Sequence, residues 1–236
     1  LVDTDAIARM DFVNDIALAF IAFGVGQYFK TVTLRQSGHK TVAITLWESL
    51  SAAVLVTASM YFLFHFSLPF SLLLGAIGCA TAPASTIMTI QQYDAKGPFV
   101  DLILQIVALD DAVALIAFSI CAAYVQASNA GGVSAGLILK PVLFNLLALL
   151  LGFLFGFVLH RAVDTDRSVQ HRLALTIAII LMLTGICAAM DISPLLSCMI
   201  LGACYINIGG SQSLFDQANR FISPILLIFF VLAGAR

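Results

Sequence analysis

Apolar residues run along this chain in long blocks that short groups of polar and charged residues separate. Eight such blocks lie near 12–29, 42–64, 68–92, 99–125, 134–159, 172–190, 194–208 and 218–236. A helix needs roughly 20 apolar residues to cross the hydrocarbon core of a bilayer. Most of the blocks reach or approach this length, so the pattern predicts an all-α, polytopic membrane bundle of about eight transmembrane helices.

The connections between the blocks carry the charge. Lys and Arg gather on alternate connections, eight on one side of the predicted membrane (Lys30, Arg35, Lys40, Lys96, Arg161, Arg167, Arg172, Arg220) and two on the other (Arg9, Lys140). Because basic residues concentrate in cytoplasmic loops, the connections at 30–41, 93–98, 160–171 and 209–219 are predicted to be cytoplasmic. In the turn at 190–194, Ser193 followed by Pro194 predicts a helix N-cap and first helical residue.

The composition agrees with a membrane protein and narrows its partners. Hydrophobic residues make up 61% of the chain and charged residues 10%, whereas a soluble domain carries roughly 25% charged residues. The net charge of -2 and the absence of a basic tract do not indicate a nucleic-acid partner. All five cysteines fall inside apolar blocks without a CxxC pair, so we expect neither disulfides nor a zinc site, and no cofactor.

A proline interrupts the third apolar block near its midpoint. Pro83 has no N–H, so the carbonyl of Cys79 loses its usual helical partner. Irregular backbone at this depth is tolerated where protein or a water-filled cavity satisfies it. Thr81 and Ser85, spaced by four residues, would place two hydroxyl groups on one face of a helix. The segment predicts a broken helix, and a simple bend satisfied by a neighbouring hydroxyl stays open as the alternative.

Two adjacent acids occupy the middle of the fourth block, in the stretch VALDDAVALI. A charged Asp at the membrane centre costs roughly 2.5–3.5 kcal/mol on insertion scales, so Asp110 and Asp111 need a reason to be there. Neighbours on a helix point about 100° apart, so one acid can face the broken helix while the other faces a different partner. Gln105 and Asp101 extend the polar content toward the cytoplasmic end. We expect a proton-exchanging site, with a purely architectural acid pair as the alternative.

A glycine pair marks a predicted contact face in the fifth block. Gly152 and Gly156 form a GxxxG motif, and small residues let helix backbones approach closely in lipid. Packing within the chain and a dimer interface are both compatible with the motif.

These motifs together resemble a known family. The segment CATAPAST, followed by ALDDAVALI and then by SPLLSCMILGA and PILLIFFVLAGA, is similar to the monovalent cation:proton antiporter superfamily, and most to bacterial sodium–proton exchangers with an Asp-Asp pair. The resemblance implies an inverted-repeat fold with a broken crossing helix. It also implies that residues 1–236 form a partial transmembrane domain, lacking about two spans before and three after. A homodimer in a bacterial inner membrane is the implied assembly and location.

The resemblance also implies roles for single residues. Asp111 would be the shared cation and proton site, and thus the metal ligand, while Asp110 would pair with a basic residue on a later helix. Thr81 and the opened backbone near Pro83 would form the unwound stretch beside the site. Arg236 is the candidate basic partner. The implied function is exchange of a monovalent cation, sodium, for protons by alternating access, with the transported ions as the only ligands.

Other functions remain as alternatives. A potassium efflux system or a sodium-coupled transporter has a related architecture, although potassium systems of this kind usually carry Gln-Asp where this chain has Asp110 and Asp111. A non-transporting membrane sensor would keep the same fold. An intramembrane aspartyl protease needs two aspartates that face each other from different helices, and no GxGD motif is present, so we do not expect an enzyme.

Overall fold

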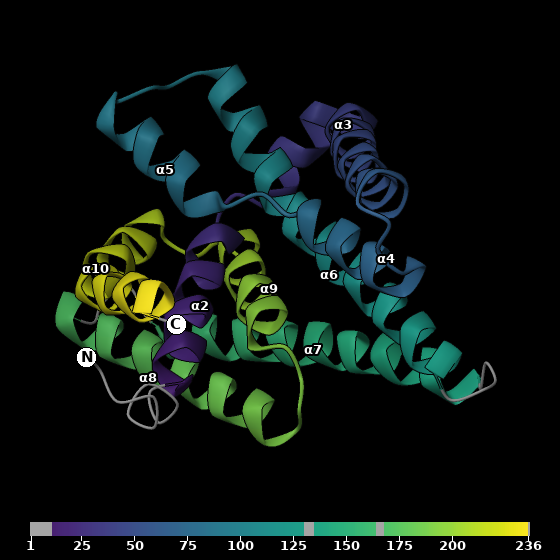
Figure 1. The fold of residues 1–236 in the computed structure, drawn as a ribbon. Coiled ribbons are helices and arrows are strands. Elements are labelled where there is room, and N and C mark those ends of the chain that lie inside the picture. The colour runs from purple at the N-terminus through teal and green to yellow at the C-terminus, as the bar shows by residue number, and fades with distance from the viewer. Residues whose placement is uncertain (1–10, 130–134, 164–167, 236) are drawn as a thin grey trace. The chain divides into compact units, whose positions relative to one another are not determined.

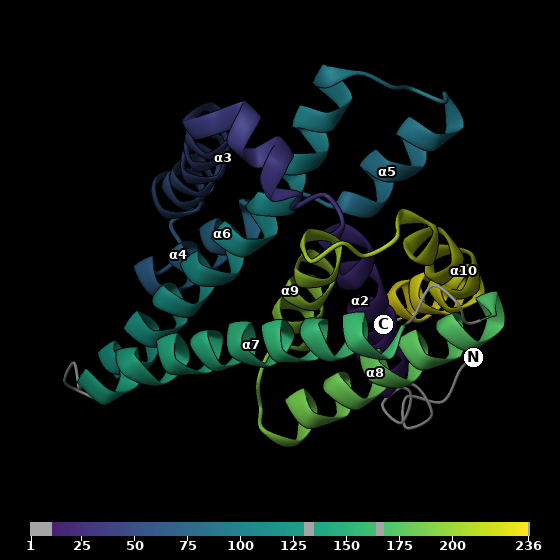
Figure 2. The same ribbon diagram turned by 180° about the vertical axis from the view of Figure 1, so that it is seen from behind.

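The computed structural model describes residues 11–129, 135–163 and 168–235, and the regular structure in these ranges is helical (Figures 1 and 2). The elements are α2 (Asp11–Gly26), α3 (Thr31–Ala58), the π-helical turn η1 (Ser59–Leu63), α4 (Leu68–Gly78), α5 (Pro83–Gln92), α6 (Pro98–Asn129), α7 (Ala135–Ala162), α8 (Val169–Ala189), α9 (Pro194–Asn207) and α10 (Gln212–Ala235). The predicted all-α fold is confirmed. The chain divides into unit 1 (Leu1–Lys30 with Asn145–Arg236) and unit 2 (Thr31–Phe144).

Helix length separates the elements into two groups. Among the described residues, four segments are long and apolar enough to cross a bilayer: His39–Leu63, Pro98–Val125, Leu143–Ala162 and Val169–Ala189. A fifth is added if Gln212–Ile222 and Pro224–Val231, bent by 48°, count as one span. Three apolar helices are shorter: Phe12–Gly26, Leu68–Gly78 and Pro194–Asn207. In chain order the helices follow the eight apolar blocks, but the third block holds two helices rather than one.

Two helices show how far the local sequence predicts the residue at which a helix begins. α9 begins at Pro194, and the Ser193 hydroxyl accepts a hydrogen bond from the Leu196 N–H at 3.5 Å, as the Ser-Pro pair predicts. α3 begins at Thr31, well before the expected start at 42. Most of the connection at 30–41 is therefore part of α3, because polar residues of fair helix propensity can extend a helix beyond its apolar block.

In unit 2, α3 packs against α4 and α6, and α4 also packs against α6. The contact between α3 and α4 is close because glycine faces it. A Cβ on Gly75 would lie 2.7 Å from the carbonyl oxygen of Ala53, and one on Gly78 would lie 3.1 Å from a methyl group of Val56. A larger residue at Gly75 would push the two helices apart.

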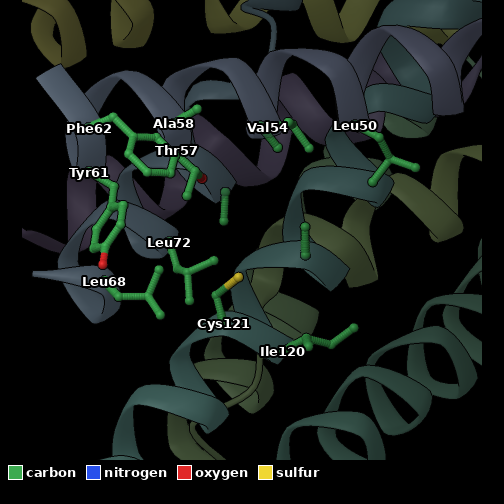
Figure 3. Close-up of a pocket in the computed structure, with 13 residues that line it drawn as sticks. Leu50, Val54, Thr57, Ala58, Tyr61, Phe62, Leu68, Leu72, Ile120 and Cys121 are labelled. Atoms are coloured by element: carbon green, nitrogen blue, oxygen red, sulfur yellow. The ribbon is translucent and has the colours of Figure 1, made fainter.

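An open apolar cavity of about 530 Å³ shows the relative direction of α3 and α6 (Figure 3). Its walls come from α3 and η1 between residues 50 and 62, from α4 between 68 and 76, and from α6 between 117 and 121. Ser49 precedes this stretch on α3 and is hydrogen-bonded to Asp110, which precedes it on α6. The two helices therefore run side by side in the same direction, and the polar pair comes before the cavity on both.

In unit 1, α2 lies against α9 and α10, and α8 packs against all three (Figures 1 and 2). Two glycines set the close approach of α2 and α9. A Cβ on Gly26 would lie 2.7 Å from the backbone nitrogen of Ala203, and one on Gly202 would lie 3.2 Å from the Cα of Gly26. The Phe23 ring stacks on that of Phe215 with centroids 4.7 Å apart, which joins α2 to α10.

The GxxxG motif of α7 faces α9 within the same unit. A Cβ on Gly152 would overlap the carbonyl oxygen of Ser197, and one on Gly156 would lie 2.6 Å from the Cβ of Cys204. The Cys204 thiol also donates to the carbonyl of Phe153 at 3.4 Å. Of the two interpretations of this motif, the contacts support packing within the chain.

The close contact of α7 with α9 at Gly152 leads to a prediction about the stability of the protein. In Gly152→Ala the added methyl group must displace the backbone of α9, so we expect the free energy of unfolding to fall by about 1–3 kcal/mol. Gly185→Ala on α8 is the matched control, because no described atom lies within 4 Å of its added Cβ. Thermal unfolding of the two purified variants decides the point, and a Gly152→Ala protein as stable as the control would contradict the α7–α9 contact.

Candidate functional site

The third apolar block is broken at the predicted place. α4 ends at Gly78 and α5 begins at Pro83, so residues 79–82 are not helical. The residue before a proline is biased away from helical backbone, and Pro83 itself is well suited to open a new helix. The Ser85 hydroxyl donates to the carbonyl of Ala82 at 3.1 Å, which satisfies one exposed backbone acceptor of the break.

Asp110 of α6 binds this break directly. Its side chain is fully buried, and one of its carboxylate oxygens accepts hydrogen bonds from the Thr81 hydroxyl and from the Thr81 N–H, the latter at 3.0 Å. The other oxygen accepts a hydrogen bond from the Ser49 hydroxyl of α3. The carboxylate therefore joins α6 to α3 and to the break between α4 and α5.

Asp111 is placed differently. Its side chain is half-buried, and within the described residues it has no hydrogen-bond or ion-pair partner. Within the described residues, Asp110 is the member of the acid pair whose side chain accepts hydrogen bonds. As the helical geometry predicts, only one of the two acids faces the broken helix, and that acid is Asp110.

Ser49 is the site residue that sequence reasoning missed. It lies within the second apolar block, after Glu48, in the stretch WESLS. This polar pair inside an apolar span is the signal that could have drawn attention to it, since intramembrane polar residues are often functional. Glu48 itself is exposed, but it lies close enough to Asp110 for the two charges to interact.

The remaining predicted residues divide into two groups. Cys79 is the first residue of the break and its thiol donates to the carbonyl of Ala76 at 3.0 Å, whereas Ser85 lies in the first turn of α5. Among the described residues, no hydrogen bond joins either side chain to Asp110. Because Thr81 precedes the first residue of α5, the helical spacing of four residues does not apply between Thr81 and Ser85. Arg236, the candidate partner of Asp110, lies outside the described residues.

The oxygen atoms gathered here suit a hard monovalent cation. The hydroxyl groups of Thr81 and Ser49 bind the Asp110 carboxylate, so the neighbouring Asp111 carboxylate, which has no described partner, is the one left for a cation, and oxygen ligands are the type that such cations prefer. In the part of the chain that the structure describes, no three His, Cys, Asp or Glu side chains group as they would around a transition metal.

Comparison with known proteins identifies the family to which nearly the whole chain matches. The family model described as "Sodium/hydrogen exchanger, transmembrane" matches residues 7–236. The chain belongs to this family. It is a transporter family, so the expected resemblance is confirmed and the chain is part of a multi-pass membrane protein. No curated protein sequence matches the chain.

A solved structure resembles this chain in fold. It is that of the sodium proton antiporter MjNhaP1 from Methanocaldococcus jannaschii, with a TM-score of 0.68 and 15% sequence identity over 98% of this chain and 58% of that chain. At this identity the likeness concerns the fold alone. The chain spans somewhat less than two thirds of the length of that antiporter.

The hydrogen bond from Ser49 to Asp110 gives a testable prediction for stability. Ser49→Ala removes one of the donors to a buried carboxylate, so we expect the free energy of unfolding to fall by about 1–3 kcal/mol. Ser71→Ala is the control, because Ser71 is also fully buried but its hydroxyl donates only to the Ser67 carbonyl of its own helix end. Thermal unfolding should show the larger loss in Ser49→Ala.

Ser49→Ala should lower the free energy of unfolding by less in a protein in which Asp110 is already replaced. In an Asp110→Asn background the charge that Ser49 solvates is gone, so the effect of Ser49→Ala should be smaller than in the natural protein. An equal effect in both backgrounds would show that Ser49 acts through packing alone.

Proposed function

We propose that this chain carries the ion-exchange site of a secondary active transporter that moves a monovalent cation, sodium, against protons. The observation that carries the proposal is the contact of the buried Asp110 with the broken helix, beside a second acid that has no described partner. Interrupted helices near the membrane midplane bring backbone polar groups to transported ions. Membership of the sodium/hydrogen exchanger family adds to this support.

The two acids have different roles in the proposed site. Asp110 accepts hydrogen bonds from Thr81 and Ser49 on both of its oxygens, so it is held in one position and anchors the break. Asp111 is half-buried and makes no hydrogen bond to a described residue, so its oxygens remain available to a cation or a proton. Asp111 is thus the residue at which the two ions compete.

Competition at one carboxylate produces exchange. A bound cation requires the charged form of Asp111, and a bound proton removes that charge, so each ion displaces the other. If the protein changes the side to which Asp111 is open only when one ion is bound, a cation crosses in one direction for each crossing of protons in the other. The transported ions are the only ligands that this mechanism requires.

Replacing Asp110 and Asp111 one at a time tests the different roles proposed for them. Asp111→Asn removes the group that carries the ions, so we expect cation-dependent proton movement to fall to background. Asp110→Asn keeps a hydrogen-bonding side chain but loses the charge, so we expect a reduced rate or an altered ratio of protons to cations. The measurement uses the full-length protein in sealed vesicles, with a pH dye to follow collapse of a pH gradient on addition of sodium, lithium or potassium.

An exposed acid serves as the control for these replacements. Asp191 lies in the turn after α8 with a positive φ of 55°, a conformation that Asn also adopts readily. Asp191→Asn should therefore exchange ions at the natural rate. Exchange by Asp111→Asn at the rate of this control would refute the proposed site.

The break itself can be tested through its proline. Pro83→Ala restores an N–H and favours a continuous helix, which would withdraw the Thr81 N–H from Asp110, so we expect exchange to fall by about tenfold or more. Pro194→Ala is the control, because Pro194 begins α9, where a helix starts in any case. Equal exchange rates in the two variants would mean that the break has no part in transport.

A further inference from the structure

The apolar cavity between α3, α4 and α6 is open and forms a groove along these helices of unit 2 (Figure 3). Two of its walls belong to segments long enough to cross a bilayer, His39–Leu63 and Pro98–Val125, so the groove lies at membrane depth. The lining side chains that are exposed by half or more are all apolar: Leu50, Val54, Phe62 and Ile120. The groove is thus continuous with the apolar surface that these two spans present to lipid.

The walls of the groove carry no charged side chain. Between Glu48 and Asp94 the sequence contains no Lys, Arg, Asp or Glu, and the wall of α6, between residues 117 and 121, contains none either. The hydroxyl group of Thr57 lies against Gly75 of α4, where an added Cβ would overlap it. The groove therefore offers contacts to an apolar occupant and no partner to a charged one.

One end of the groove has the features of a membrane–water interface. Tyr61 lines the groove at this end and carries a hydroxyl group, and the turn that follows contains the exposed His65 and Ser67. The ring of Phe66 packs on that of Phe70, with centroids 5.2 Å apart. Aromatic residues of this kind concentrate where the bilayer meets water, so the polar groups of this turn lie at headgroup level.

The dimensions of the groove match one leaflet of a bilayer. Its wall on α3 and η1 runs from Leu50 to Phe62, a length of about 18 Å at the rise of a helix. Half of the hydrocarbon core of a bilayer is roughly 15 Å thick. The volume of about 530 Å³ also falls within the roughly 300–1,000 Å³ of pockets that hold small molecules.

We propose that this groove binds one acyl chain of a phospholipid that has no net charge. The acyl chain lies along the apolar walls and reaches toward the level of the Ser49–Asp110 contact. The headgroup lies at the other end, where Tyr61, His65 and Ser67 can form hydrogen bonds with its ester and phosphate oxygens. An anionic headgroup is selected by Lys and Arg, which this stretch of the sequence lacks.

A lipid bound here contacts the helix that leads to the break. Ala76 lines the groove, and its carbonyl accepts a hydrogen bond from the thiol of Cys79, the first residue of the break. The acyl chain therefore packs against the last turn of α4. This inference does not rest on the proposed function, because lipid binding is measured without any transport.

The first test measures the phosphatidylcholine that stays with the purified full-length protein. The protein is stripped of lipid in detergent, incubated with labelled phosphatidylcholine and separated from free lipid by gel filtration. Ala117→Phe and Ala58→Phe place a ring in the groove from two different walls, so both should lose the lipid that the natural protein retains. Raising the salt concentration should leave retention by the natural protein unchanged, because no charged side chain lines the groove.

Ala178→Phe is the matched control, because Ala178 is exposed on α8, in the other unit. It should retain phosphatidylcholine as the natural protein does. Equal retention by all three variants would overturn the inference, and so would release of the lipid by salt.

Cys121 provides a second test that needs no substitution. It lines the groove and is partly exposed, whereas the other four cysteines, Cys79, Cys187, Cys198 and Cys204, are buried. Because thiol modification depends on access, N-ethylmaleimide should modify Cys121 in the lipid-stripped protein, and phosphatidylcholine should slow this reaction several-fold. An unchanged rate would overturn the inference. Failure of Cys121 to react without lipid would also overturn it, because another part of the protein or a second copy would then fill the groove.

Discussion

The structure of unit 2 depends on the need to solvate one buried carboxylate. Asp110 is fully buried, and a charge without partners in such a place costs several kcal/mol. In a continuous helix the Thr81 N–H would bond to the carbonyl of Ile77, but in the broken helix it is the Ala80 N–H that bonds there, at 3.2 Å. The break thus releases the Thr81 N–H for Asp110. The acid and the interruption of the helix therefore require each other.

This mutual dependence explains why two acids stand together. An acid whose oxygens are occupied by Thr81 and Ser49 holds α6 against α3 and against the break, but it is poorly placed to change partners. Its neighbour points about 100° away and can change ligands without disturbing those contacts. In the proposed site, Asp110 gives rigid support and Asp111 exchanges ions, and such rigid support is what a precise binding site needs.

The sequence predicted the parts of this arrangement that local chemistry determines. Pro83 predicts the break, the position of Asp110 and Asp111 in an apolar block predicts a site, and Ser193 with Pro194 predicts the start of α9. The role of Ser49 could not be predicted in this way, because its partner lies 61 residues away and the pairing depends on how α3 packs against α6. Helical geometry requires the acids to face different ways, but only tertiary packing decides that Asp110 faces the break.

The surroundings of the Ser49–Asp110 contact differ along α3. Before Ser49, α3 carries the buried hydroxyl groups of Thr41 and Thr45. After Ser49, α3 and α6 line an open groove whose walls are almost wholly apolar (Figure 3). An apolar groove offers an ion no oxygen ligand in place of its hydration shell. In the proposed mechanism an ion therefore reaches the acid pair at Asp111, on the half-buried face of α6, and alternating access requires that this one acid open to each side in turn.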